Sequence, residues 1–203
     1  MKVLRNNKGF TLLEIVIGMA IGIGIMVLIT YLIGDLSEQN LRFTQTLTGQ
    51  ESAQQTLQVM IPEIRSAAPS NIGNYPIEQA GTSTLIFYSD TNGDGFLERI
   101  RYYLSGDVFN KGVIKPTGNP LEYNSNNEKS YSLVSSIVNG DSPIFSYYGA
   151  NATSSQSAPL SQPVDINSVR MIKVSLIFNQ GDEYNPNIVG IENQATIRNL
   201  RFQ

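Results

Sequence analysis

The feature that most constrains this chain is an apolar run from Phe10 to Ile33, close to the N-terminus. It holds 24 residues and a single charged side chain, Glu14. As a helix rising about 1.5 Å per residue, the run is long enough to cross a bilayer core about 30 Å thick. We therefore expect a membrane-spanning helix. We also expect Glu14 to need a partner, because an isolated carboxylate in lipid costs about 2–4 kcal/mol.

Charge asymmetry predicts the orientation of this helix. Lys2, Arg5 and Lys8 precede it with no acid among them, whereas Asp35 and Glu38 follow it. Positively charged flanks stay on the cytoplasmic side, so we expect a single-pass protein of the inner (cytoplasmic) membrane with its N-terminus in the cytoplasm. A simple N-terminal anchor is the plainer alternative, and it needs no carboxylate inside the span.

The segment Lys8-Gly9-Phe10-Thr11-Leu12-Leu13-Glu14, with the apolar run after it, resembles the processing site of type IV pilins and type II secretion pseudopilins. In that family a prepilin peptidase cuts after the glycine and methylates the new amino terminus. The resemblance implies cleavage between Gly9 and Phe10, methylation of Phe10 and an assembly role for Glu14. It also implies a later position in an extracytoplasmic filament or at the cell surface.

Cleavage would supply a partner for Glu14, because it creates an ammonium group at Phe10. Residues four apart share a helix face, and opposite charges lower the cost of burying each other in lipid. The pair can form within one helix or between neighbouring helices, and snorkelling of Glu14 toward the interface is the alternative. The resemblance implies other partners as well: further pilin or pseudopilin subunits, an inner-membrane assembly platform and membrane lipid.

We expect four parts along the chain. Residues 1–9 are the leader that is cleaved, and residues 10–34 are the transmembrane and filament-core helix. Residues 35–68 continue this helix as an amphipathic stretch, and residues 69–203 form an extracytoplasmic β-rich head. The head is long enough to have a hydrophobic core of its own.

An apolar stripe carries the helical period beyond the membrane. Its members recur at three- and four-residue steps: Leu36, Phe43, Leu47, Leu57, Ile61, Ile64 and Ala68. We expect one continuous helix of about 60 residues, with a kink or a local break at Pro62, which lacks a backbone donor. A separate short helix after a hinge near Gly34 or Gly49 is the alternative.

The head contains segments rich in β-branched and aromatic residues, which are typical of strands. They are Thr84–Ser89, Leu97–Leu104, Val108–Ile114, Ile144–Tyr148, Met171–Phe178 and Ile188–Leu200. Tyr131–Val138 fits a helix or a strand, and Gly149–Pro163 is typical of an exposed loop. We therefore expect an α+β fold in which the long helix packs on an antiparallel sheet.

The acidic loop, residues 90–98, is the best candidate for an ion site. Oxygen side chains fall on its positions 1, 3 and 5 and a glycine on position 6, which matches the first half of a calcium loop. The ligands would be Asp90, Asn92, Asp94, the carbonyl of Phe96 and Glu98. Position 12 is Arg101, where an EF-hand has a glutamate. Asn-Gly and Asp-Gly also favour tight turns, so a plain hairpin is the alternative to a structural calcium.

Composition argues against several other functions. The chain has no cysteine and no histidine, so it can form no disulfide, thiol nucleophile or histidine-based metal site. Removing the leader leaves 11 basic and 17 acidic residues, a poor balance for binding nucleic acid, and we expect no such partner. No catalytic constellation stands out, so we expect no enzyme and, apart from calcium, no cofactor.

Within the pilin superfamily the chain most resembles the J-type and W-type minor subunits. The cues are the size of the head, Ile64-Arg65-Ser66-Ala67 near the helix end, and a terminal strand that ends in Ile197-Arg198-Asn199-Leu200. The expected function is that of a structural subunit, a minor pilin of a type IV pilus or a pseudopilin of a type II secretion-like pseudopilus. A tip adhesin or DNA-uptake subunit of such a filament is the alternative.

Overall fold

The computed structural model describes residues 12–150, 157–181 and 186–200, without the side chains of residues 32–49. The chain divides into two compact units, Met1–Gln45 and Thr46–Gln203.

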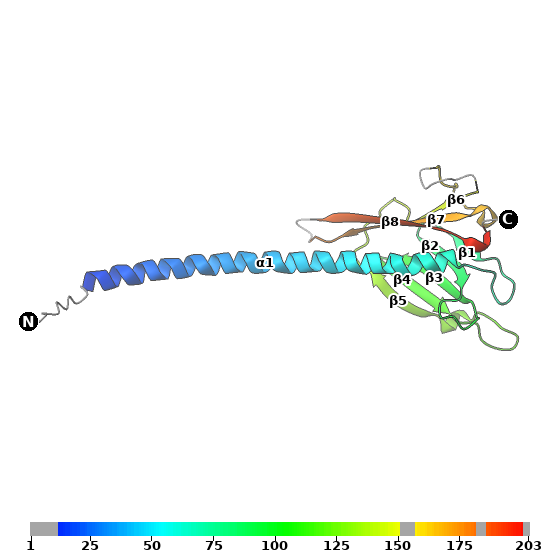
Figure 1. Ribbon diagram of the computed structural model, residues 1–203, viewed down its shortest axis with the longest axis horizontal. Coiled ribbons are helices and arrows are strands. Elements are labelled where there is room, and N and C mark those ends of the chain that lie inside the picture. The colour runs from blue at the N-terminus through cyan, green and yellow to red at the C-terminus, as the bar shows by residue number, and fades with distance from the viewer. Residues whose placement is uncertain (1–11, 151–156, 182–185, 201–203) are drawn as a thin grey trace, which may run out of the picture. The chain divides into compact units, whose positions relative to one another are not determined.

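One helix, α1, runs from Leu12 to Arg65 (Figure 1). Neither Gly34 nor Gly49 interrupts it, so the prediction of a single long helix is confirmed. Pro62 lies inside the helix, so a local break at this residue is wrong, whereas the alternative of a kink stays a prediction. The proline is tolerated because its ring is exposed at the helix surface and the next turn closes normally. In that turn Ser66 donates from its backbone N–H to the Pro62 carbonyl at 3.0 Å.

Among the described residues of the unit Thr46–Gln203, eight strands form two antiparallel sheets. The first sheet has the order β1-β2-β3-β4-β5, with β1 Ile77–Ala80, β2 Thr84–Ser89, β3 Glu98–Ser105, β4 Val108–Ile114 and β5 Lys129–Val134. The second has the order β6-β7-β8, with β6 Phe145–Tyr148, β7 Met171–Asn179 and β8 Ile188–Thr196. The short 3-10 helices are η1 Ser125–Asn127, η2 Ile166–Ser168 and η3 Arg198–Leu200. The expected α+β class is therefore confirmed.

Three details of the predicted strands need correction. Strand β1 was not expected, because its four residues include the polar Glu78 and Gln79. The ambiguous segment Tyr131–Val138 is a strand only as far as Val134. The last strand ends at Thr196 and is followed by η3, because the chain turns there to bury apolar side chains at the C-terminal end.

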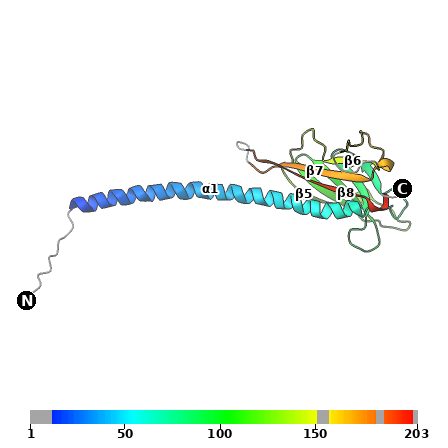
Figure 2. The same cartoon turned by 45° about the horizontal axis from the view of Figure 1, so that its top comes forward.

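One hydrophobic core joins the last turns of α1 to both sheets (Figures 1 and 2). On the helix its members are Ala53, Leu57, Met60, Ile61 and Ile64, and Ala67 follows two residues after the helix end. The predicted stripe is confirmed at Leu57, Ile61 and Ile64, whereas Ala68 is only half-buried. The earlier stripe residues Leu36, Phe43 and Leu47 have side chains outside the described set. Burying each large apolar side chain contributes about 1.5–3 kcal/mol, so this face holds the end of α1 in the head.

Strand β7 runs through the middle of the second sheet and contributes alternate residues to the core. Ile172, Val174, Leu176 and Phe178 are buried, and the residues between them are half-buried. This is the alternation that the sequence predicts for Met171–Phe178.

Candidate functional site

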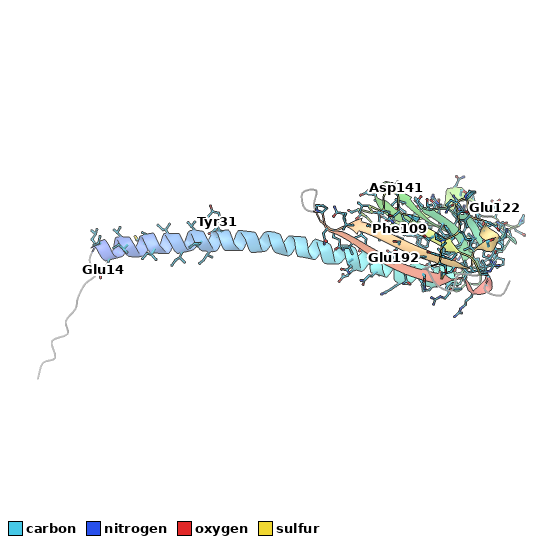
Figure 3. The ribbon with its side chains drawn as sticks, turned by 90° about the horizontal axis from the view of Figure 1, so that it is seen from above. Glu14, Tyr31, Phe109, Glu122, Asp141 and Glu192 are labelled. Atoms are coloured by element: carbon cyan, nitrogen blue, oxygen red, sulfur yellow. The ribbon has the colours of Figure 1, made fainter. Side chains whose placement is uncertain are left out.

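Leu12–Tyr31 is, by length and composition, the segment able to cross a membrane in the part of the chain that the structure describes. Its 20 residues have a mean hydropathy of 2.7, and none is buried against the rest of the protein. Figure 3 shows its side chains projecting all round α1 between Glu14 and Tyr31. A continuous apolar surface of this size is unfavourable in water, so the segment requires lipid or other helices around it.

The predicted processing point directly precedes this segment. The leader cations and the cleavage residues lie outside the described residues: Lys2, Arg5, Lys8, Gly9 and Phe10. Glu14 is described, and it lies in the first turn of α1 on the helix surface (Figure 3). It is the single charged side chain among residues 12–31. Its predicted pairing with the amino group of Phe10 stays a prediction.

Three glycines of the segment, Gly18, Gly22 and Gly24, leave open space beside the helix. A Cβ atom added at any of them would meet nothing within 4 Å. Packing within the described part of this chain therefore does not require their small size. The four-residue spacing of Gly18 and Gly22 is typical of close contact between helices in a membrane.

The acidic loop connects the antiparallel strands β2 and β3. Asp90 accepts hydrogen bonds from the backbone N–H groups of Gly93 at 2.7 Å and Gly95 at 2.9 Å. Asn92 and Asp94 each accept one from the N–H two residues further on. Gly95 has φ +83°, a left-handed conformation that favours glycine. The loop is thus a hairpin turn, closed by its own side chains.

Glu98 closes the loop from the start of β3. Its buried carboxylate accepts bonds from the N–H of Thr91 at 3.0 Å and from Nδ2 of Asn92 at 2.9 Å. Lys115 forms an ion pair with Asp94 and is the main reason that the pKa of Asp94 is lowered. Among the described residues no three acidic side chains gather as a metal ion would require. Calcium at this loop stays a prediction of the sequence.

The head also contains a groove of about 1040 Å³, which the sequence did not predict. Residues of α1 line one wall, residues of β5 line another, and β3 and β4 contribute the floor. Lys111 on β4 is opposite Tyr102 on β3 and Tyr131 on β5, so these three side chains share one face of the sheet. The same face receives α1, because the Tyr102 hydroxyl donates to Glu63 of the helix at 2.6 Å. Burial, together with the charge of Glu63, raises the pKa of Tyr102.

Lysines gather in this groove. Four lysines follow the predicted leader in the sequence, and three of them, Lys111, Lys115 and Lys129, line the groove. Lys111 is paired with Glu63 at 2.5 Å, and both side chains are mostly buried. Lys115 is paired with Asp94. For Lys129 the structure shows no ion pair among the described residues.

Comparison with known proteins finds one family model at the N-terminus. Residues 4–31 match the model described as the prokaryotic N-terminal methylation motif. A search of curated proteins gave no match. The matched residues include two of the leader cations, Arg5 and Lys8, the predicted cleavage point, Glu14 and the apolar segment as far as Tyr31.

Proposed function

The chain carries the N-terminal motif of the type IV pilin and pseudopilin family, and we propose that it is a minor subunit of a type IV pilus or a type II secretion-like pseudopilus. The motif implies processing by a prepilin peptidase and a structural, non-enzymatic role. The observation that carries the proposal is the match over residues 4–31, which covers the predicted cleavage point and most of the apolar run.

In this proposal the precursor is held in the inner membrane by its apolar helix, with the leader in the cytoplasm. The peptidase cuts between Gly9 and Phe10 and methylates Phe10. The mature subunit then passes through the assembly platform into a filament, where other helices replace lipid around residues 12–31. The exposure of every residue in that segment supports this exchange, because each apolar side chain needs an apolar neighbour outside this chain.

Glu14 acts in assembly in this proposal. Cleavage creates a positive amino terminus at Phe10, and a carboxylate four residues on can pair with it in the same subunit or in a neighbour. Between subunits the pairing also sets the axial position of one helix against the next, because both charges would otherwise be isolated in an apolar surrounding.

Processing tests the proposal directly. The full chain is expressed in membranes with and without an active prepilin peptidase, and its intact mass and N-terminal sequence are measured. We expect a chain that begins at Phe10 and carries one methyl group on its amino terminus. Gly9→Val should stay uncut. A matched control is Gly18→Ala, where the added Cβ meets nothing within 4 Å, and it should be cut normally. A wild-type chain that keeps its leader would refute the proposal.

The assignment to a J-type or W-type minor subunit rests on the head. The two segments that resemble those subunits lie together, since Asn199 Nδ2 donates to the carbonyl of Ala67 at 2.8 Å. The C-terminal segment thereby closes the end of the long helix. Recovery of the chain in a complex with other minor subunits would test this finer assignment, and recovery along the whole filament shaft would contradict it.

A tip adhesin or a DNA-uptake subunit is the second candidate function. The observation that favours a binding role is the open groove beside α1. The acidic balance of the chain without its leader makes DNA the less suitable ligand.

A further inference from the structure

We propose that the groove between α1 and β5 binds an extended acidic segment of a partner protein, which adds to the free edge of β5 as a sixth strand. The proposal concerns the unit Thr46–Gln203 alone and does not depend on the pilin assignment. An experiment that refutes binding at the groove would therefore leave the pilin assignment untouched, and the reverse also holds.

The first support is the free edge itself. Strands β1, β5, β6 and β8 end the two sheets. Strand β1 has four residues and an irregular register, and the outer side of β6 already bonds to Thr82 and Leu160. Strand β8 carries Glu192 on its exposed surface, which would repel an acidic segment.

Strand β5 is the remaining edge strand. It has six residues, and within the described chain its outer side has no backbone partner. An extended peptide can bond to such an edge through its main chain.

The second support is uncovered apolar surface on both walls. Val59 on α1 is 50% exposed, and Tyr131 on β5 is 52% exposed. Lys129, Tyr131 and Leu133 follow one another at alternate positions of β5, and all three line the groove. An added strand brings its own alternate side chains to the same face. Those side chains would cover Val59 and Tyr131.

The third support is charge. Three lysines and a single carboxylate, Glu98, line the groove. Glu98 is buried and bonded inside the protein, and Lys111 is neutralised by Glu63. Lys129 and Lys115 are therefore the lysines available to a ligand. The side chain of Lys115 is 52% exposed despite its pair with Asp94. Carboxylates on the added strand would meet these two cations, whereas a basic segment would meet like charge.

The test uses the full chain in lipid nanodiscs and three short peptides. In each peptide the residues at every second position, which share one face of an added strand, are valine in turn with glutamate, glutamine or lysine, and serine stands between them. Affinity is measured by fluorescence anisotropy, and hydrogen exchange is measured for the β5 amides. We expect the glutamate peptide to bind best and to slow exchange in β5. Lys129→Glu should weaken its binding about tenfold or more, and the lysine peptide should then bind better than the glutamate peptide. Lys173→Glu, a matched reversal on β7, should leave the affinity unchanged.

Three results would overturn the proposal. The first is equal binding of all three peptides, and the second is binding that leaves β5 exchange unaltered. The third is failure of the glutamate peptide to bind at about 1 mM, including the case in which an oligosaccharide or an oligonucleotide occupies the groove instead. Thermal unfolding of each variant verifies that the head is folded, and the exchange of β7 amides provides an internal reference.

Discussion

Gly112 of β4 leaves room for an ion pair that crosses the outer face of the five-stranded sheet. Arg101 on β3 donates two hydrogen bonds of 2.8 Å to Glu128, and its guanidinium lies 3.8 Å from the centre of the Tyr103 ring. The carboxylate of Glu128 lies directly over Gly112, where a Cβ would be 1.9 Å from Oε1. A glycine in a strand interior is usually unfavourable, and here the ion pair accounts for it.

The substitution Gly112→Ala should therefore displace Glu128 from Arg101. We expect the free energy of unfolding to fall by about 1 kcal/mol, because the pair is partly buried and its two bonds would be lost. Chemical unfolding followed by the tyrosine signals of the head measures this. Gly190→Ala in β8 is the control, since its nearest new contact is an ordinary 3.8 Å to Ile177. Equal effects of the two substitutions would contradict this account.

The hydrogen bonds of Glu78 predict how the stability of the head depends on pH. Arg99 donates to both oxygens of Glu78, at 2.7 and 2.6 Å, and Tyr88 donates at 2.5 Å. The bond from Arg99 is the main reason that the pKa of Glu78 is lowered. Below the ordinary glutamate pKa of about 4.5 the unfolded chain takes up a proton more readily than the folded head. The interaction thus stabilises the head above this pH, and the stabilisation is lost as the pH falls through the lowered pKa.

Accordingly, Glu78→Gln should flatten the decline of stability between about pH 6 and pH 3. Unfolding curves of the wild type and the variant across this range provide the measurement. Parallel curves would mean that Glu78 has the same pKa in the folded and unfolded chain.

At the scale of elements, periodic and compositional signals predicted most of the fold. The strands Thr84–Ser89 and Val108–Ile114 have the predicted bounds, because each is a β-branched and aromatic run between turn residues. Strand β1 was missed, since Ile77 is its single large apolar residue and pairing with β2 decides its conformation. Of the two outcomes predicted for Pro62, a kink or a local break, the break does not occur, since α1 continues to Arg65 and the neighbouring Ile61 and Ile64 are buried in the core.

The two candidate sites differ in how far the sequence could predict them. The methylation motif is contiguous, so its charges, glycine and apolar run can be recognised together. The groove combines residues of α1, such as Val59, with Lys111 and Lys129 on separate strands. These residues lie far apart in the sequence, and only the pairing of β3, β4 and β5 brings them to one face. No local spacing carries that information.

The hydrogen bonds of the acidic loop, residues 90–98, predict how the head responds to calcium. Asp90 already accepts two backbone N–H groups, Lys115 pairs with Asp94, and Glu98 is bonded to Thr91 and Asn92. Because the turn is closed by these bonds, we expect calcium at about 1 mM to leave the melting temperature of the head unchanged. Calorimetry with calcium and with a chelator measures this. An increase with calcium that Asp90→Asn abolishes would establish the predicted calcium site.

At the scale of the whole molecule, the chain combines two units that are stabilised in different ways. The apolar segment Leu12–Tyr31 buries nothing within the described chain and depends on lipid or neighbouring helices. The unit Thr46–Gln203 has its own core and, without cysteine, no disulfide. Substitutions at Glu14 should therefore affect assembly and leave the folding of the head unchanged.

We propose that this chain is a filament subunit and that Glu14, in its first helix turn, directs assembly. The most direct test measures the chain in filaments sheared from cells that contain the assembly machinery, relative to the amount in their membranes. We expect the wild type in both fractions, and Glu14→Ala in the membrane alone. Glu51→Ala, an exposed glutamate further along α1, should behave as the wild type. Glu14→Ala in the filaments at the wild-type level would contradict the account.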